Sequence, residues 1–425
     1  MKKLLYILTF FSLACCSLIS CSPEEDDIFS ESAANRMTDK LAEYGQLLAS
    51  AHNGWKMEYF SDNEQLNGGR TFLMHFGSGD SVTMAGDMAD PTYRSTSLYS
   101  LIADAGPVLS FNSYNSLFHD FSEPKGSANT EGYGGDYEFT FMEATDSRIV
   151  LKGKKSGNRI ILTRMAEDQD WTAYLESLSD IEIKSICGRY RVYIDGKERL
   201  VIQNADRNFV IPDTVDGIPG VVNVGFLYTP EGIRTYKPMD IYGAKVQNFT
   251  WDATTESLVS KEGGTEVRLE AFPYSYQVAY DEYPGEWVMK YDDGAGNNFV
   301  KNVTISVKKY GESFTLSGLR YDLILNYNKL GGYVYLNHQY VGMYQDYFMF
   351  ICLSGDSYYT WDTGVMYAGI WDEQPGDMNI VFMDNGSWNH KVDGALLYAF
   401  SSQEADGNNG VGSLERYMNI TMTKK

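Results

Sequence analysis

Trp55-Lys56-Met57-Glu58-Tyr59-Phe60 opens the part of the sequence that decides the fold, and Thr71-Phe72-Leu73-Met74-His75-Phe76 and Ser81-Val82-Thr83-Met84 follow it. Apolar and polar residues alternate along most of these segments, which is the spacing of a strand with one buried face. Gly68-Gly69 stands before the second segment, and such glycine pairs mark turns. The stretch therefore predicts antiparallel strands joined by tight turns.

The same alternation recurs along the rest of the chain. Strand-like segments lie at 136–141, 148–153 and 159–163, and others lie from 188 to 211 and from 283 onward. The 425 residues include 32 Tyr and 40 Gly, a composition that favours strands and turns. We expect a mainly β protein made of antiparallel sandwich or barrel-like subdomains.

Two segments have helical spacing instead. From about Glu31 to Ala51 apolar residues recur every three or four positions, with Ser30 or Ser32 as N-cap and Asn53-Gly54 as stop. A short linking helix is predicted behind the acidic segment 167–170, because acidic residues suit a helix start. Its shared apolar face consists of Trp171, Tyr174, Leu175 and Leu178.

These patterns divide the chain. We expect a signal peptide at 1–20, an acidic tether at 21–30, and an N-terminal helix with an antiparallel β domain at 31–166. A second β region at 167–282 and an aromatic-rich C-terminal β domain at 283–425 complete it.

A short motif occurs twice, with Gly, Trp, Met and Tyr in the same order at 54–59 and 285–291. One interpretation is that each copy opens a β domain whose Trp closes one end of the core. The other is coincidence in a chain rich in Trp and Tyr.

The N-terminus has the pattern of a signal peptide. Lys2 and Lys3 precede an apolar segment from Leu4 to Cys16, which is shorter than the ~20 residues of a membrane-spanning helix. Leu18-Ile19-Ser20-Cys21 resembles the cleavage signal of bacterial lipoproteins, so Cys21 is the predicted lipidation site. The alternative is an ordinary secretory peptide in which the cysteine is incidental.

Charge limits the class of partner. The chain has 35 basic and 57 acidic residues and a formal charge of −22, and it has no basic cluster, so we expect no nucleic acid partner. The run Ser22 to Asp27 resembles the export tag of surface lipoproteins in the Bacteroidota phylum. The same residues would also make a solvated tether.

Cysteine usage suggests no disulfide framework. Beyond Cys21 only Cys187 and Cys352 remain, far apart in sequence. A disulfide between them is allowed in an oxidising compartment, but we expect two buried free thiols.

Motifs of catalysis are absent from the sequence. The five histidines form no His-Glu-x-x-His zinc motif, and no Gly-x-Ser-x-Gly elbow or phosphate-binding loop occurs. A pair of carboxylates, as in glycosidases, cannot be selected from 57 acidic residues. We therefore predict no catalytic residue, no metal ligand and no cofactor.

Aromatic residues are concentrated between Tyr340 and Trp388, among Asp, Asn and Gly. Flat rings beside polar side chains suit the apolar faces and hydroxyl rims of sugars, although aromatic residues also fill β cores. Three residues at turns or strand ends are the candidate ligand platform: Trp361, Trp371 and Trp388.

From Ile28 to about Met165 the chain resembles a lipoprotein family of Bacteroidota, the domain of unknown function 4302. The residues that carry this resemblance are 51–55, 107–115, 118–122, 134–139 and 151–155. The resemblance implies a lipoprotein of the outer membrane, exposed at the cell surface and associated with a porin-like transporter and its glycan- or peptide-capturing lipoprotein. It implies no activity and no catalytic residues.

Together these observations favour a surface-exposed outer-membrane lipoprotein that serves nutrient uptake as a non-catalytic accessory binding protein for a glycan or peptide. One alternative is a surface glycoside hydrolase, or another hydrolase, with an unrecognised carboxylate pair. The other is a structural envelope component that contacts only proteins.

Overall fold

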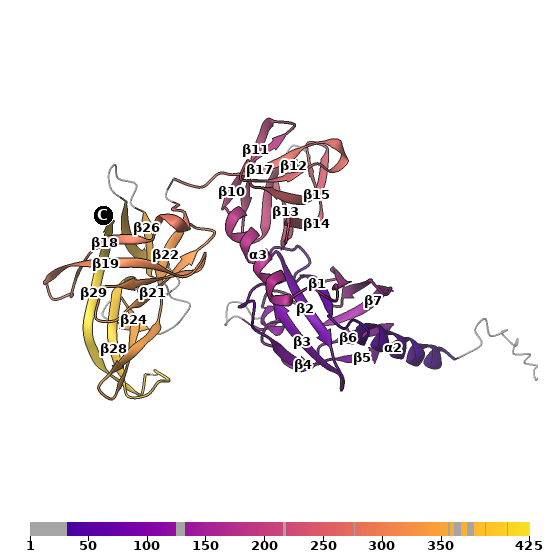
Figure 1. The fold of residues 1–425 in the computed structure, drawn as a ribbon, viewed down its shortest axis with the longest axis horizontal. Coiled ribbons are helices and arrows are strands. Elements are labelled where there is room, and N and C mark those ends of the chain that lie inside the picture. Colours follow the sequence, from indigo (N-terminus) through magenta and orange to yellow (C-terminus); the bar gives the residue numbers. More distant parts are fainter. Residues whose placement is uncertain are drawn as a thin grey trace, which may run out of the picture.

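The computed structural model describes residues 32–124, 132–215, 218–275, 277–355, 358–360, 367–371, 378–386, 388–405 and 407–425. Strands dominate these residues and form three antiparallel sheets in succession along the chain (Figure 1). The mainly β architecture predicted from the sequence is confirmed.

The first sheet has nine strands in the order β4-β3-β2-β1-β9-β8-β7-β6-β5. Its edge strands β4 and β5 are separated in the chain by Tyr99 alone, so the sheet curls until its two edges approach each other. The strands are β1 (Trp55–Phe60), β2 (Gly69–Phe76), β3 (Ser81–Gly86), β4 (Ser95–Leu98), β5 (Ser100–Ala103), β6 (Pro107–Ser110), β7 (Glu138–Ala144), β8 (Arg148–Gly153) and β9 (Arg159–Arg164), with a short 3-10 helix η1 (His119–Phe121).

Both predicted helices are present. In α2 (Ala33–Ala49) the Ser32 side chain accepts a hydrogen bond from the Asn35 amide at 3.2 Å, and the buried Leu48 faces the core of the first sheet. In α3 (Trp171–Ser185) Asp170 accepts from the Ala173 amide at 2.7 Å. Each helix thus begins behind a side-chain cap that the sequence pattern supplies.

The second sheet is a closed barrel of strands β10 to β17. They are β10 (Arg189–Ile194), β11 (Lys197–Asn204), β12 (Asn208–Val215), β13 (Ile218–Thr229), β14 (Gly232–Ile241), β15 (Ala244–Asp252), β16 (Ser257–Ser260) and β17 (Val267–Ala271), with η2 (Glu262–Gly264). Helix α3 packs Leu175 and Leu178 into the barrel core, and Leu73 and Ala85 of the first sheet belong to the same cluster. The first sheet, α3 and the barrel therefore share buried apolar contacts.

The third sheet has twelve strands. Pairing of β18 with β29 closes β18 to β22, β26, β27 and β29 into a ring, and β28, β24, β23 and β25 extend from it. These are β18 (Gly285–Asp292), β19 (Asn298–Lys309), β20 (Ser313–Ser317), β21 (Leu323–Asn328), β22 (Tyr333–Leu336), β23 (Gln339–Tyr344), β24 (Tyr347–Gly355), β25 (Tyr358–Thr360), β26 (Tyr367–Trp371), β27 (Asn379–Asp384), β28 (Val392–Phe400) and β29 (Gly410–Lys424), after η3 (Tyr280–Glu282).

The two copies of the repeated motif have equivalent roles. Trp55 and Trp287 lie in the first strands of the first and third sheets, and both are fully buried. Their indole nitrogens donate to main-chain carbonyls of Leu48 and Tyr283, each at 2.9 Å. The structure supports the interpretation in which each Trp closes a core.

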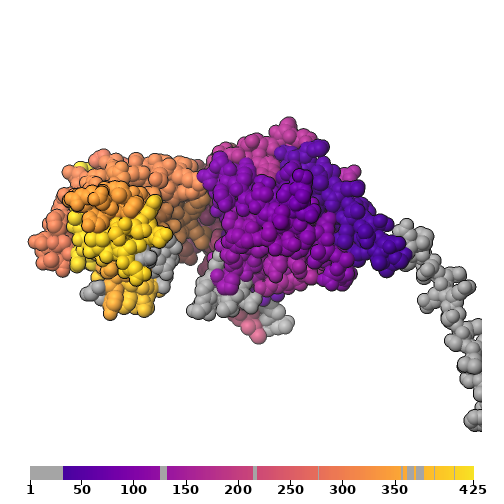
Figure 2. Space-filling model, turned by 90° about the horizontal axis from the view of Figure 1, so that it is seen from below, coloured from indigo at the N-terminus to yellow at the C-terminus, as the bar shows by residue number. Residues whose placement is uncertain are grey.

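The three sheets form an elongated molecule. Helix α2 lies at one end of the long axis and the third sheet at the other (Figure 1), and Figure 2 shows the indigo and yellow parts of the chain well separated. Within the described ranges, neither helix is both long and apolar enough to cross a membrane. Cys187 and Cys352 are buried free thiols, as expected.

Candidate functional site

The predicted site residues are only partly placed. Cys21 and Trp361 lie outside the described residues, so lipidation and that part of the platform stay predictions. Trp371 ends β26, where its backbone pairs with Ile380, and its side chain is not among those described. Trp388 is partly buried and packs against the core of the third sheet.

Trp388 belongs to a row of rings. Its centroid lies 4.8 Å from that of His390, and His390 stacks on Tyr358 at 4.2 Å. Nearby, Tyr359 and Tyr398 stack at 4.7 Å with their hydroxyls 3.0 Å apart. These rings are called the outer aromatic face; Tyr358 and Tyr359 are exposed, whereas Trp388 is partly buried.

A groove lies where strands β18 and β29 separate. Their pairing stops at Asp292 and Met418, beside a bulge in which Asn419 has a φ of 50°. Beyond this point a groove of about 980 Å³ opens between the start of β19, the 318–320 turn and the first half of β29. Its volume is within the range of ligand sites in proteins.

Three aromatic rings form the floor of this groove and the core beneath it. Phe299 stacks on Tyr291 with centroids 5.1 Å apart and an interplanar angle of 16°, and Tyr417 meets Tyr291 edge-on at 5.1 Å. Tyr291 and Tyr417 are buried, whereas Phe299 is 37% exposed. The floor therefore offers one accessible ring, Phe299, stacked on the buried Tyr291, which in turn packs against the buried Tyr417.

A charged side-chain pair spans the groove. Arg320 Nε donates to Glu415 Oε1 at 2.5 Å, and the Tyr417 hydroxyl donates to Glu415 Oε2 at 2.6 Å. Burial raises the pKa of the Glu415 carboxyl, but these two hydrogen bonds and the charges of Arg320 and Lys301 outweigh it, so the pKa lies below its usual value. Glu415 is therefore ionised at neutral pH.

The other acidic side chain lining the groove is Asp293. Hydrogen bonds from the Asn297 side chain and from the Ala295 amide hold its pKa below the usual value. Asp293 thus stabilises the turn between β18 and β19, where residues 292–298 form a hairpin tip.

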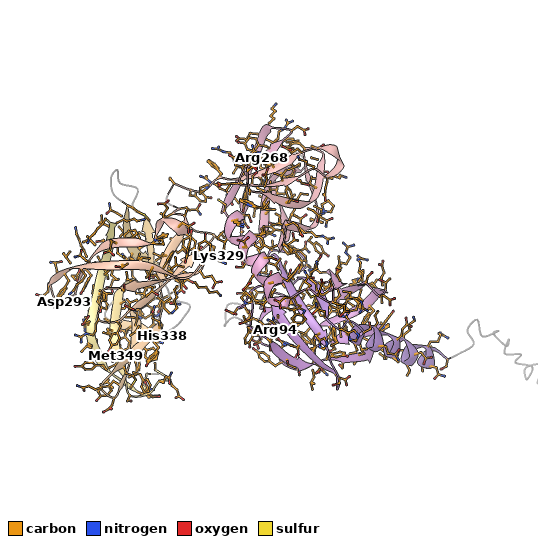
Figure 3. All side chains as sticks on the ribbon, viewed as in Figure 1. Arg94, Arg268, Asp293, Lys329, His338 and Met349 are labelled. Atoms are coloured by element: carbon orange, nitrogen blue, oxygen red, sulfur yellow. The ribbon has the colours of Figure 1, made fainter. Side chains whose placement is uncertain are left out.

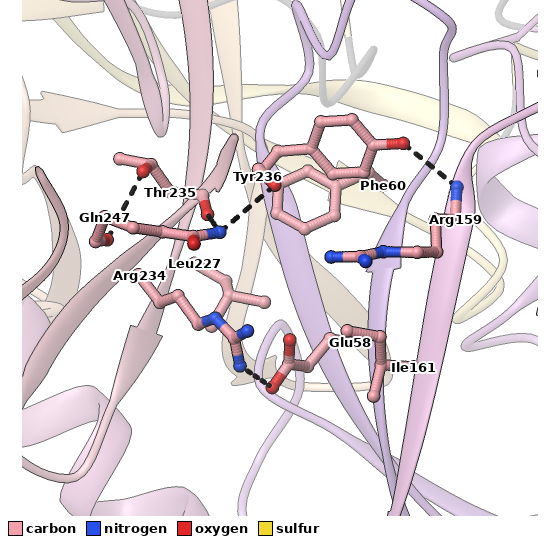
Figure 4. A pocket seen from close by; sticks show the side chains of 9 residues that line it. All are labelled: Glu58, Phe60, Arg159, Ile161, Leu227, Arg234, Thr235, Tyr236 and Gln247. Carbon is pink, nitrogen blue, oxygen red and sulfur yellow. Dashed lines mark hydrogen bonds and ion pairs between the residues drawn. The ribbon is translucent and has the colours of Figure 1, made fainter. Parts of the chain in front are cut away.

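Two other cavities are lined by charged side chains that pair with one another. Between the first sheet and the barrel, Arg234 Nη1 pairs with Glu58 Oε1 at 3.1 Å and Tyr236 accepts from the Arg159 amide at 2.9 Å (Figure 4). The space left there is about 10 Å³, at most one water molecule. These contacts explain how the two sheets are joined.

A cavity of about 300 Å³ lies where all three sheets meet. Arg207 pairs there with Asp87 and Glu182, and Lys329 of the third sheet also pairs with Glu182 at 3.2 Å. Its charged groups bind one another, which indicates a structural junction.

His119 has a structural role, because both of its ring nitrogens contact main-chain groups. His119 Nδ1 accepts from the Asn115 amide at 3.1 Å, and its Nε2 lies 3.0 Å from the Phe111 carbonyl. Over the described ranges, no group of three or more His, Cys, Asp or Glu side chains is arranged to hold a metal ion.

Sequence patterns did not point to the groove. Tyr291 and Phe299 flank the 292–298 turn, and this is a local sign of a paired aromatic floor. Arg320 and Glu415 are 95 residues apart, and only the closing of β29 onto β18 brings them together.

Comparisons with known proteins give families without an assigned activity. The model described as "Domain of unknown function (DUF4302)" matches residues 25–253, beyond the region traced from the sequence. A second, DUF4987, also a domain of unknown function, matches residues 260–398.

No curated protein matches the chain. Among solved structures, the beta chain of DNA polymerase III from Streptococcus pneumoniae TIGR4 aligns over 80% of this chain and 94% of that chain, at 10% identity. Its TM-score of 0.11 is too low to carry an argument. The DUF4302 model matches more than half of the residues of this chain, and the chain therefore belongs to the DUF4302 family.

Proposed function

We propose that this protein is a lipid-anchored protein of the outer cell surface that binds a carbohydrate for a nutrient-uptake system without cleaving it. The groove between β18, β19 and β29 is the observation that carries the proposal. Its partners are a porin-like outer-membrane transporter and the capture lipoprotein of that transporter.

The groove has the chemistry of a carbohydrate site. A sugar ring stacks on an exposed aromatic ring through its C–H face, and its hydroxyls hydrogen-bond to polar walls. Phe299 supplies the ring, and Arg320 and Lys301 supply hydrogen-bond donors around it. An open groove also admits an internal segment of a long chain.

Binding is favoured over hydrolysis by the acids of the groove. A two-carboxylate glycosidase needs one carboxyl with a raised pKa as proton donor. Asp293 and Glu415 both have lowered pKa values, and each is occupied by hydrogen bonds from neighbouring residues. The groove therefore offers no proton donor of that kind.

The position of the groove supports a surface anchor. Asp293, at the hairpin tip beside the groove, lies on the outer side of the third sheet, and Lys329 lies on the side that faces the other two sheets (Figure 3). Helix α2, which follows the predicted tether, lies at the opposite end of the molecule (Figure 1). Lipid on Cys21 would thus hold the groove away from the membrane.

Binding is tested by electrophoresis in native gels that contain an embedded polysaccharide, which slows the migration of a protein that binds it. The soluble chain starting at Ser22 serves, because residues 1–21 include none of the described residues. We expect retention by at least one polysaccharide, loss of retention in Phe299→Ala, and no release of reducing ends. Retention that survives Phe299→Ala but is lost on replacing Trp361, Trp371 or Trp388 by Ala would move the site to the outer aromatic face.

The anchor has its own test. Mass spectrometry of the full-length protein should find acyl chains on Cys21, and Cys21→Ala should leave the protein in the soluble fraction. An unmodified N-terminus, or a Cys21→Ala protein that still sediments with vesicles, contradicts the lipoprotein proposal. Proteolysis of intact cells then tests outward orientation.

A further inference from the structure

We infer that the groove selects acidic polysaccharides, those whose sugars carry carboxylate or sulfate groups. This inference rests on the proposed function, since it names the class of carbohydrate for the same site. It comes from the charges around the aromatic floor.

The groove differs in charge from the rest of the chain. Overall the chain carries a formal charge of −22, yet the side chains lining the groove include three cations, Lys301, Arg320 and Arg416, against the two acids Asp293 and Glu415. Asp293 is occupied by its own turn. A local excess of positive charge in a strongly acidic protein attracts anions to the groove.

Lys301 is the main free cation. It lies on the same face of β19 as Phe299 and the core residue Val303, and it pairs across the ladder with the buried Met289. Among described side chains it has no ion-pair partner, although its charge lowers the pKa of Glu415. Its ammonium group is therefore available beside the exposed ring of Phe299.

Arg320 supplies a second cation with guanidinium donors that are available to a ligand. Its side chain is 45% exposed, and only its Nε is engaged by Glu415 in the hydrogen bond described above. The remaining guanidinium donors can reach a carboxylate or sulfate in the fork geometry that arginine favours. A sugar stacked on Phe299 would then have its acidic group between Lys301 and Arg320.

The test compares polygalacturonate with its methyl ester, a pair that differs in charge on the same backbone, and adds other acidic polymers. Native gels contain polygalacturonate, the same polymer with methyl-esterified carboxylates, sulfated and carboxylated polysaccharides such as chondroitin sulfate and alginate, or poly-L-glutamate. Because the protein and the acidic polymers repel each other overall, retention by an acidic polymer reports a specific site.

We expect retention by at least one acidic polysaccharide, weakening as NaCl is raised. Lys301→Gln should weaken it about tenfold, the effect of one charge-assisted hydrogen bond. Lys308→Gln is the matched control, because Lys308 is an exposed lysine of the same strand beyond the groove. It should leave retention unchanged.

Glu415→Gln gives a test of opposite sign. Removing the carboxylate frees Arg320 and deletes a negative charge, so retention by the acidic polysaccharide should increase severalfold. If Glu415 only stabilises the fold of the groove, Glu415→Gln should decrease retention by the acidic polysaccharide instead. Thermal unfolding of each variant separates loss of fold from loss of binding.

Retention by neutral polysaccharides alone, with loss in Phe299→Ala, overturns the inference and leaves the proposed function standing. Equal retention by poly-L-glutamate overturns the choice of carbohydrate. Retention by no polymer overturns both proposals.

Discussion

Arg207 and Asp87 form an ion pair of 2.6 Å between the barrel and the first sheet, with side chains that are only 6% and 2% exposed. Arg207 also donates to Glu182 of α3 at 3.2 Å and to the main-chain carbonyl of Gly69 at 3.1 Å. One guanidinium thus joins three elements that are far apart in the sequence. Burial lowers the pKa of Arg207, but the charges of Asp87 and Glu182 more than compensate and raise it.

The first prediction concerns this junction. Arg207→Met should lower the free energy of unfolding by about 3 to 5 kcal/mol, because it leaves the buried Asp87 carboxylate without its cation and leaves Glu182 paired with Lys329 alone. Urea unfolding followed by tryptophan fluorescence measures the change. Lys184→Ala, which breaks an exposed pair with Asp180, is the control and should cost about 0.5 kcal/mol or less. Equal urea midpoints for Arg207→Met and the parent protein would contradict the stabilising role assigned to Arg207.

The sequence predicted those features that depend on residues close together in the chain. Ser32 and Asp170 act on amides three residues away, so the two helix starts were visible as local patterns. Alternation likewise revealed the strands, because each strand carries its own buried face.

Contacts distant in sequence were not visible. No local pattern shows that Met289 pairs with Met422, which closes the third sheet, or that Arg320 meets Glu415. The groove exists only because of these pairings. The aromatic platform rested on local turn patterns, and Trp388, the one member whose side chain is described, is partly buried.

The second prediction concerns Trp55. Trp55→Phe should destabilise the protein by about 1 to 3 kcal/mol, since it leaves the Leu48 carbonyl without its hydrogen bond in a buried position. Because Leu48 lies in the last turn of α2, amide exchange should increase there more than in the barrel. Trp251→Phe, at a partly buried position, is the control. Uniform exchange across all three sheets would contradict a local role.

The third prediction concerns thiol reactivity. Burial raises the pKa of the Cys352 thiol to about 12, so almost no thiolate exists at pH 8. The chain starting at Ser22 should release almost no chromophore from a thiol-reactive disulfide reagent while folded. In denaturant without reductant it should show two reactive thiols, from Cys187 and Cys352. Thiols that appear only after reduction would instead indicate a disulfide.

The fourth prediction is a pH dependence at the same junction. Burial raises the pKa of the Glu182 carboxyl, but the charges of Arg207 and Lys329 outweigh it and hold this pKa below the usual value. A carboxyl with a lowered folded-state pKa contributes its full stability above its unfolded pKa, about 4.3, and loses that contribution as the pH falls through the folded value. Glu182→Gln should therefore be less stable at pH 7 and lose less stability on acidification.

Urea midpoints from pH 7 to pH 3 measure this difference. The two curves should approach each other as the pH falls below the unfolded pKa of about 4.3, because protonation removes from the parent protein the charge that Glu182→Gln already lacks. Glu43→Gln is the control, since Glu43 forms an exposed pair with Lys40 and should leave the curve unchanged. Because Lys329 joins Glu182 to the third sheet, Lys329→Gln should reproduce part of the loss at pH 7. Parallel curves for Glu182→Gln and the parent protein would show that this carboxylate does not couple stability to pH.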